Sequence, residues 1–84
     1  MNVEVRFFAS LREAAGTGSL RVAVPEGAGF DALMAALEQR LEPAAVAALR
    51  AGNVRLARNQ DLVTTPFRLA DGDELAFLPP VTGG

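Results

Sequence analysis

The sequence has no cysteine, no histidine and no lysine among its 84 residues, so every basic side chain is an arginine. Without cysteine there is no disulfide framework. Without cysteine and histidine there is no thiolate or imidazole that could bind a metal or act as a nucleophile or base. A Ser–His–Asp triad is excluded for the same reason. Classical catalysis by these side chains is poorly supported, and we expect the chain not to be an enzyme on its own.

Strong net charge and long apolar runs are absent as well. Eight basic residues against ten acidic ones give a formal net charge of −2, which does not fit a nucleic-acid-binding surface. No apolar run approaches the roughly 20 residues that span a membrane. The charges of Glu4 and Arg6 interrupt the apolar stretch that a signal peptide needs. We expect a cytoplasmic protein with no nucleic-acid partner and no membrane partner.

The composition is that of one small globular domain, with 50% hydrophobic and 21% charged residues. Apolar side chains occupy alternating positions over residues 3–7 and again over 19–24, which predicts two strands. The spacing between them suggests a hairpin with an enlarged connection. A short helix is predicted within this connection over residues 10–15, with Ser10 as its N-cap and Gly16 as its end.

The middle of the sequence changes to helical periodicity. Apolar residues recur every three or four positions and form one stripe. They are Phe30, Leu33, Met34, Leu37 and Leu41. This pattern predicts the main helix. Pro43 ends that helix and can open a second helical piece over residues 44–50, which Gly52 closes.

The last third returns to strands. A third strand begins at Val54 and runs to a turn at residues 59–61, and a short return strand follows at 62–63. An Asp-Gly tight turn at residues 71–72 precedes a final strand over 74–78. The order is β-β-α-β-β, with the short return strand at residues 62–63 as an extra strand, and the apolar first and last strands suit neighbouring central positions. We predict an α+β, ubiquitin-like β-grasp, in which one main helix crosses a mixed sheet.

Two groups of charged residues have more than one interpretation. The acidic residues around the tight turn fit either a metal or acid–base cluster or a turn with exposed carboxylates, and the Asp-Gly pair favours the turn. They are Asp71, Asp73 and Glu74. Four arginines fit either an anion-binding face or, more commonly, solvated charges at strand edges. They are Arg6, Arg12, Arg55 and Arg58. Arg12 and Glu13 fit a local ion pair or a contact with a partner.

The end of the sequence, residues 79–84, reads Pro-Pro-Val-Thr-Gly-Gly. The two prolines favour an extended conformation, and six residues span at most about 20 Å. A carboxylate at Gly84 can therefore enter a pocket of another protein, and a narrow channel can close around glycines that have no side chain. We expect a globular domain over residues 1–78 and a flexible, extended tail over 79–84. A frayed end is the alternative.

Three segments of the sequence resemble the small subunit of molybdopterin synthase, a family of ubiquitin-like sulfur carriers. They are residues 5–16 (VRFFASLREAAG), 71–78 (DGDELAFL) and 79–84 (PPVTGG). The resemblance covers the whole chain and includes Asn59. The Gly-Gly ending is shared by every ubiquitin-like carrier, but its combination with the Phe-Phe-Ala and Leu-Arg-Glu opening is specific. One departure is Leu78, where the family often has a second aromatic residue after Phe77.

The resemblance implies a mechanism in two stages. An adenylyltransferase of the ubiquitin-activating type uses MgATP to convert the Gly84 carboxylate into an acyl-adenylate, because AMP is a good leaving group. A sulfur donor then gives a C-terminal thiocarboxylate. The tail next enters the large subunit of the synthase, in an assembly expected to be a heterotetramer. There two sulfurs build the dithiolene of molybdopterin from cyclic pyranopterin monophosphate. The chain itself is expected to bind no cofactor and no metal.

The residues expected to meet the partner fall into two sets. The tail residues that thread into the channel are Pro79, Pro80, Val81, Thr82 and Gly83, with Gly84 at the reactive end. The residues expected at the partner interface are Phe8, Arg12, Phe77 and Leu78. Phe8 alternates out of phase with the apolar residues of its strand and is expected to face water or a partner, although a second buried layer is the alternative. Adjacent first and last strands would place Phe8 beside Leu78.

Three other functions remain as alternatives. One is a sulfur carrier for thiamine, cysteine or tRNA thiolation, although thiamine-type carriers look shorter and usually lack the Phe-Phe-Ala opening. Another is a ubiquitin-like modifier joined through Gly84 to lysines of target proteins. The third is an interaction module with a frayed end. The absence of lysine argues against chains of this protein linked to itself through side chains.

Overall fold

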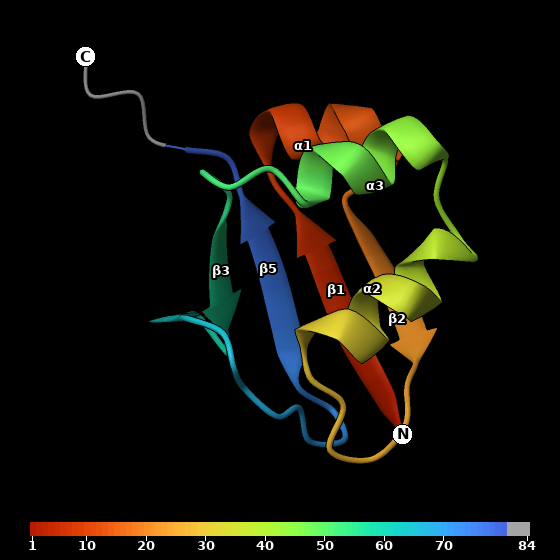
Figure 1. Ribbon diagram of the computed structural model, residues 1–84, viewed down its shortest axis with the longest axis vertical. Helices are drawn as coiled ribbons and strands as arrows, with labels where there is room; N and C mark the ends of the chain where they lie inside the picture. Colours follow the sequence, from red (N-terminus) through yellow and green to blue (C-terminus); the bar gives the residue numbers. More distant parts are fainter. Residues whose placement is uncertain (81–84) are drawn as a thin grey trace.

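In the computed structural model, which describes residues 1–80, five strands form one mixed sheet and three helices accompany it (Figure 1). The elements in chain order are β1 (Asn2–Phe7), α1 (Ala9–Ala15), β2 (Ser19–Ala23), α2 (Phe30–Glu38), α3 (Pro43–Leu49), β3 (Arg55–Arg58), β4 (Asp61–Val63) and β5 (Glu74–Leu78). The strand order across the sheet is β2-β1-β5-β3-β4. The first and last strands are neighbours, as the sequence predicted, and the β-grasp fold is confirmed.

The neighbouring strands β1 and β5 run parallel, and the remaining neighbours pair antiparallel. The period-2 pattern of β1 places Val3, Val5 and Phe7 in the core, where none is more than 1% exposed. β1 and β2 form the predicted hairpin, with Val5 opposite Leu20 and α1 in the connection. The central strands are thus held on both sides by neighbouring strands.

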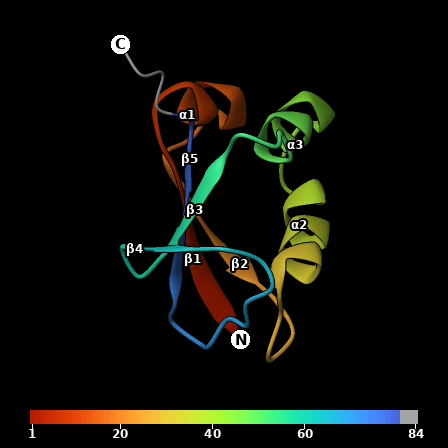
Figure 2. The same ribbon diagram turned by 60° about the vertical axis from the view of Figure 1, so that its left-hand side comes forward.

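The helices α2 and α3 cover only one face of the sheet. Figure 2 shows them together on one side, with α1 at the end of the sheet where β5 finishes. In α2 the residues Leu33, Met34 and Leu37 are all 0% exposed, which is the result expected from the apolar stripe. None of the helices in residues 1–80 has the length and apolar character needed to cross a membrane.

The main helix is one turn shorter than its apolar stripe. α2 ends at Glu38, whereas the stripe continues to Leu41. The N–H of Leu41 still donates to the carbonyl oxygen of Leu37 at 2.9 Å, so the closing turn keeps Leu41 half-buried against the core. Burial therefore continues past the point where the helix stops.

The short helix α1 begins earlier than predicted. Its N-cap is Phe8, and no side chain caps it, so the prediction of Ser10 as the cap is wrong. The carbonyl oxygen of Phe8 already accepts the N–H of Leu11 at 3.0 Å, and the helix therefore begins directly where β1 ends. Its predicted end at Gly16 is confirmed, because Gly16 is the C-cap with φ +77°.

The helix α3 begins at Pro43, as predicted, and ends sooner than expected. Its C-cap is Arg50, whose N–H donates to the carbonyl oxygens of Val46 at 3.1 Å and Ala47 at 3.2 Å. The prediction that Gly52 closes the helix is therefore wrong. Gly52 lies in the turn that leads to β3.

Candidate functional site

The tail leaves the domain from the middle of the sheet. β5 ends at Leu78, and its parallel partner β1 ends at the same level, because Phe7 is in register with Phe77. The N–H of Phe8 donates to the carbonyl oxygen of Phe77 at 3.2 Å, so the two strands stay joined to the end of β5. The flexible tail was predicted over residues 79–84, of which residues 81–84 lie outside the described residues, so the tail and its division from the domain at residue 78 stay predictions.

Two aromatic rings fix the end of β5 in the core. The rings of Phe7 and Phe77 stack with centroids 5.9 Å apart and an interplanar angle of 20°. Phe77 is 0% exposed, so its side chain has no surface to offer a partner. The placement of Phe77 at the partner interface is therefore corrected, because the same alternation that places the half-buried Leu78 on the opposite face turns Phe77 into the core. Its role is to anchor the base of the tail.

The face of the sheet opposite the helices carries exposed apolar side chains. We call it the open face. From strand alternation and register, it includes Glu4, Arg6, Phe8, Arg21, Arg55, Ala57, Leu62, Glu74, Ala76 and Leu78. Phe8 is 38% exposed and Leu62 is 64% exposed, and they are the exposed large hydrophobic residues of residues 1–80. The prediction that Phe8 faces away from the core is confirmed.

The apolar part of the open face includes two small, buried residues. Ala57 and Ala76 pair across β3 and β5 and are 7% and 5% exposed. Leu62 is opposite Ala57 in the β3–β4 ladder, and Leu78 follows Ala76 on the same face. The register also places Phe8 beside Leu78, since each follows a residue of the Phe7–Phe77 pair. Larger apolar side chains thus lie next to two small, buried ones on this face.

Sequence reasoning missed Leu62 on this face. β4 has only three residues, and a period-2 pattern cannot be recognised over so short a run. The short return strand could have indicated it. Leu62 is the antiparallel partner of Ala57, and residues paired in this way lie on the same face of the sheet.

The arginines do not form one anion-binding face. The ion pairs within residues 1–80 are Arg6–Glu74 at 3.7 Å, Arg50–Glu38 at 2.9 Å and Arg58–Asp73 at 3.1 Å. The guanidinium of Arg6 also lies 5.5 Å from the centre of the Phe8 ring. Arg58 pairs with Leu75 and so lies on the helix side of the sheet. The local Arg12–Glu13 ion pair is not formed in this part of the chain, and the guanidinium of Arg12 instead lies over Gly18.

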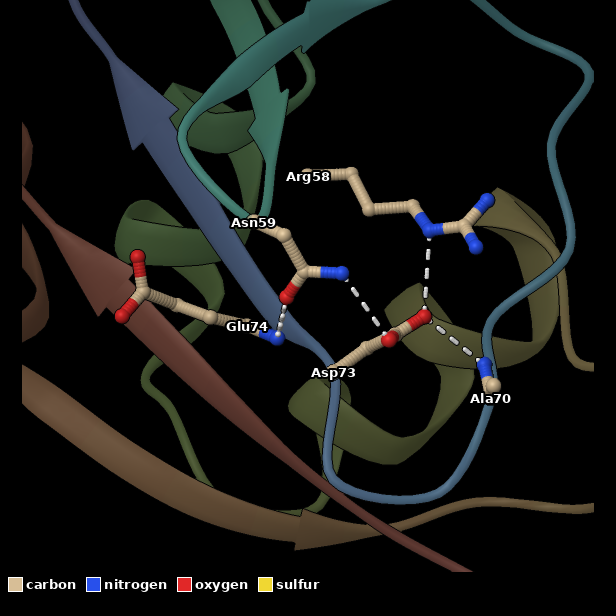
Figure 3. Close-up of polar contacts among 5 residues, drawn as sticks. All are labelled: Arg58, Asn59, Ala70, Asp73 and Glu74. Carbon is tan, nitrogen blue, oxygen red and sulfur yellow. Dashed lines mark hydrogen bonds and ion pairs between the residues drawn. The ribbon is translucent and has the colours of Figure 1, made fainter.

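A polar network fixes the start of β5 (Figure 3). One carboxylate oxygen of Asp73 accepts from the Asn59 amide at 3.0 Å, and the other accepts from the Ala70 N–H at 2.8 Å and pairs with Arg58. The amide oxygen of Asn59 accepts from the Glu74 N–H at 2.9 Å. The hydrogen bond from Asn59 lowers the pKa of Asp73, with the Ala70 N–H and the charge of Arg58 contributing, against a smaller opposing effect of burial.

This network corrects the interpretation of the acidic residues. Asp73 is only 8% exposed, so the expectation of exposed carboxylates is wrong for it, because the three contacts of its carboxylate replace water. Asp71 does have turn chemistry, since its carboxylate accepts from the N–H of Asn2 at 2.8 Å and Gly72 follows with φ +84°. No group of three possible metal ligands occurs within the described part of the chain. The acidic cluster is structural.

A five-stranded mixed sheet with α2 and α3 on one face, whose last strand lies at the centre, defines a ubiquitin-like β-grasp protein. The family model described as the ThiS family matches residues 5–84, and the chain belongs to this family. It is 43% identical over 84 residues to the molybdopterin synthase sulfur carrier subunit of Escherichia coli, covering 98% of this chain and 99% of that relative. The resemblance predicted from the sequence is confirmed.

Solved structures agree with this assignment. Small archaeal modifier protein 1 of Haloferax volcanii is 30% identical with a TM-score of 0.80, over 95% of this chain and 98% of that one. A chain of the complex of subunits 1 and 2 of the molybdopterin-converting factor of Helicobacter pylori is 28% identical with a TM-score of 0.70, and the match covers 100% of both chains.

Proposed function

We propose that this protein is the sulfur carrier subunit of a molybdopterin synthase and serves the biosynthesis of the molybdenum cofactor. The observation that carries the proposal is the 43% identity to a sulfur carrier subunit along nearly the full length of both chains. The structure supports it, because the chain leaves the sheet at Leu78 beside an open face with exposed apolar side chains. The protein is not an enzyme on its own but a subunit of one.

The activation steps follow from the chemistry of a carboxylate. The Gly84 carboxylate is a poor electrophile, so an adenylyltransferase of the ubiquitin-activating type joins it to AMP from MgATP and releases pyrophosphate. A sulfur donor then displaces AMP and leaves a thiocarboxylate on Gly84. Because activation consumes MgATP, we place the protein in the cytoplasm. The chain contributes the reacting carboxylate and a narrow glycine backbone around which an enzyme can close.

The transfer step requires a partner, because this chain has no histidine, cysteine or lysine to move protons or sulfur. We propose that the large subunit of the synthase supplies these groups and takes the tail, residues 79–84, into its active site. There the thiocarboxylate donates sulfur to cyclic pyranopterin monophosphate. Phe8 and Leu78 are the proposed docking residues, with Arg12 at their edge, and the assembly is proposed to be a heterotetramer.

The proposal is tested by the intact mass of the protein isolated from cells. A carrier shows a fraction whose mass increase corresponds to one oxygen exchanged for sulfur. A variant that lacks Gly83 and Gly84 shows none, while its melting temperature stays nearly unchanged because both residues lie beyond β5. Sulfur transfer retained by the truncated variant would contradict the proposal that this protein is a sulfur carrier.

A second candidate function is protein modification, and one observation favours it. The fold matches small archaeal modifier protein 1 at a TM-score of 0.80. A modifier would form amide bonds between Gly84 and lysines of other proteins. Mass spectrometry of tryptic digests from cells distinguishes the two functions, since a modifier leaves Gly84 on lysine side chains and a sulfur carrier does not.

A further inference from the structure

A groove of about 610 Å³ lies beside the base of the tail on the open face. The residues that matter to its chemistry are Asn53, Arg55, Leu62, Leu78, Pro79 and Pro80. Leu62 and Leu78 also belong to the apolar part of the open face, so the groove continues the proposed docking surface toward the tail. A partner that takes the tail must pass over it.

The groove combines apolar walls with one cation. Leu62 is 64% exposed, and the two prolines have no N–H to donate. Arg55 is exposed and lies directly opposite Leu78 in the β3–β5 ladder, on the same face. Within residues 1–80 Arg55 forms no ion pair, whereas Arg6 and Arg58 are each held by a carboxylate. The charge of Arg55 is therefore available to a group from outside.

We propose that this groove binds a segment of the large subunit in which an apolar side chain stands next to a carboxylate. The apolar side chain packs between Leu62 and Leu78, and the carboxylate pairs with the guanidinium of Arg55. A guanidinium can donate two parallel hydrogen bonds to a carboxylate, so it fixes orientation as well as charge. The inference rests on the proposed function in one respect, namely that the large subunit is the protein that takes the tail.

The charge distribution supports this partner chemistry. Although the chain has a net charge of −2, Glu74, one of the acidic residues of the open face, is paired with Arg6. Arg55 thus presents a positive charge beside the base of the tail. A partner with a carboxylate at this position gains an attraction that aligns it before the tail enters.

The test compares two variants with the same charge change. Arg55→Glu alters the groove, and Arg21→Glu alters an exposed arginine on β2, the edge strand at the far side of the open face. We expect Arg55→Glu to weaken binding to the large subunit about tenfold or more at low salt, with a smaller difference at high salt. We expect Arg21→Glu to change the affinity less than about twofold. Equal affinities of the two variants would overturn the inference.

Two controls separate the possible failures. Thermal melts check that both variants are folded, as expected for exposed side chains. If the wild-type chain does not bind the large subunit, the proposed function fails. A different result would count against the groove inference alone. In that case the wild-type chain binds the large subunit and Phe8→Ala weakens the binding, but Arg55→Glu does not weaken it.

A photo-crosslinking residue at position 55 of the full chain identifies the occupant. The expected product joins position 55 to a peptide of the large subunit that contains an aspartate or glutamate next to an apolar residue. A crosslink to residues 81–84 of the chain itself would show that the groove holds its own tail instead. A crosslink to a second copy of the chain, or no crosslink in the assembled complex, would also overturn the proposal.

Discussion

At the scale of single residues, Asp73 joins the end of β3 and its following turn to the loop that precedes β5. Its carboxylate contacts Asn59 in the β3–β4 turn, Ala70 in the loop before β5, and Arg58 in β3. Because β5 begins at the next residue, these contacts set the position from which the central strand runs to the base of the tail.

The pH dependence of stability follows from Asp73. Its pKa is lowered in the folded protein, so its ionised form contributes stability that is complete above its ordinary pKa of about 3.9 and is lost as the pH falls through the lower folded value. We expect Asp73→Asn to lower the free energy of unfolding at pH 7 by about 1–3 kcal/mol. Between pH 5 and pH 2, the free energy of unfolding should decrease less in this variant than in the wild type. Urea denaturation at several pH values measures this. Asp61→Asn, an exposed control, should behave as wild type.

Phe77 is in register with Phe7 and faces the core, whereas Phe8, the next residue after Phe7, faces the other side of the sheet. A variant of Phe8 should therefore affect binding, and a variant of Phe77 should affect stability. Phe8→Ala should weaken binding to the large subunit by on the order of 2 kcal/mol with little change in melting temperature, because Phe8 is partly exposed. Phe77→Ala should destabilise the fold by about 3–5 kcal/mol, because Phe77 is 0% exposed. Calorimetric binding and melts measure both. If Phe8→Ala mainly unfolds the domain, the assignment of Phe8 to the open face is wrong.

At the scale of elements, the sequence predicted those with strong periodicity. The alternation in β1 and the helical stripe of α2 each place several apolar residues in one core, and both elements were found where expected. The neighbouring positions of β1 and β5 were also predictable, because both strands are rich in apolar residues.

The missed features depend on contacts between elements. The Phe8 carbonyl replaces Ser10 at the start of α1 because β1 continues its hydrogen bonds to β5 as far as Phe8. Asp73 is buried partly because Arg58 and Asn59, which are distant from it in the sequence, contact its carboxylate, and no local pattern shows this. Leu62 joins the open face only through the register of β4 with β3. Features of this kind can be recognised only when the strand pairing of the folded sheet is known.

The end of α1 offers a test of backbone conformation. Gly16 has φ +77°, where a Cβ is strained even though nothing lies within 4 Å of it, and its N–H donates to Arg12 at 3.0 Å. We expect Gly16→Ala to lower the free energy of unfolding by about 1 kcal/mol. Gly52→Ala is the matched control, because that site is equally open and its φ is not in the left-handed region. Equal stability of the two variants in urea would contradict this account.

At the scale of the whole molecule, the absence of lysine limits what the activated tail can react with. The α-amino group of Met1 is the only primary amine in the 84 residues, and it donates to the carbonyl oxygen of Val24 at 2.9 Å. The base of the tail is at the other end of the sheet (Figure 1). The four residues 81–84 span at most about 14 Å, so an activated Gly84 has no nearby amine on its own chain.

We therefore expect the protein, incubated with its activating enzyme and MgATP but no sulfur donor, to form the adenylate without covalent multimers. Arginine does not accept the acyl group, since its guanidinium stays protonated. Arg21→Lys supplies an exposed amine and should give multimers joined at residue 21, which shows that the assay can detect them. Denaturing electrophoresis and peptide mapping provide the measurement. Wild-type multimers mapped to an internal residue would contradict the expectation.

The parallel pairing of β1 and β5 also has a mechanical consequence. When a tail held in a partner's channel is drawn along its axis, the force enters the domain at Pro79 and passes into β5. β5 is bonded to β1 on one side and to β3 on the other, and Phe77 locks it to Phe7 through stacked rings. A force directed along β5 loads all of these hydrogen bonds at the same time, in shear. An edge strand that is pulled away from its sheet instead loses its hydrogen bonds one after another. The tail can be pulled while the domain that carries it stays folded.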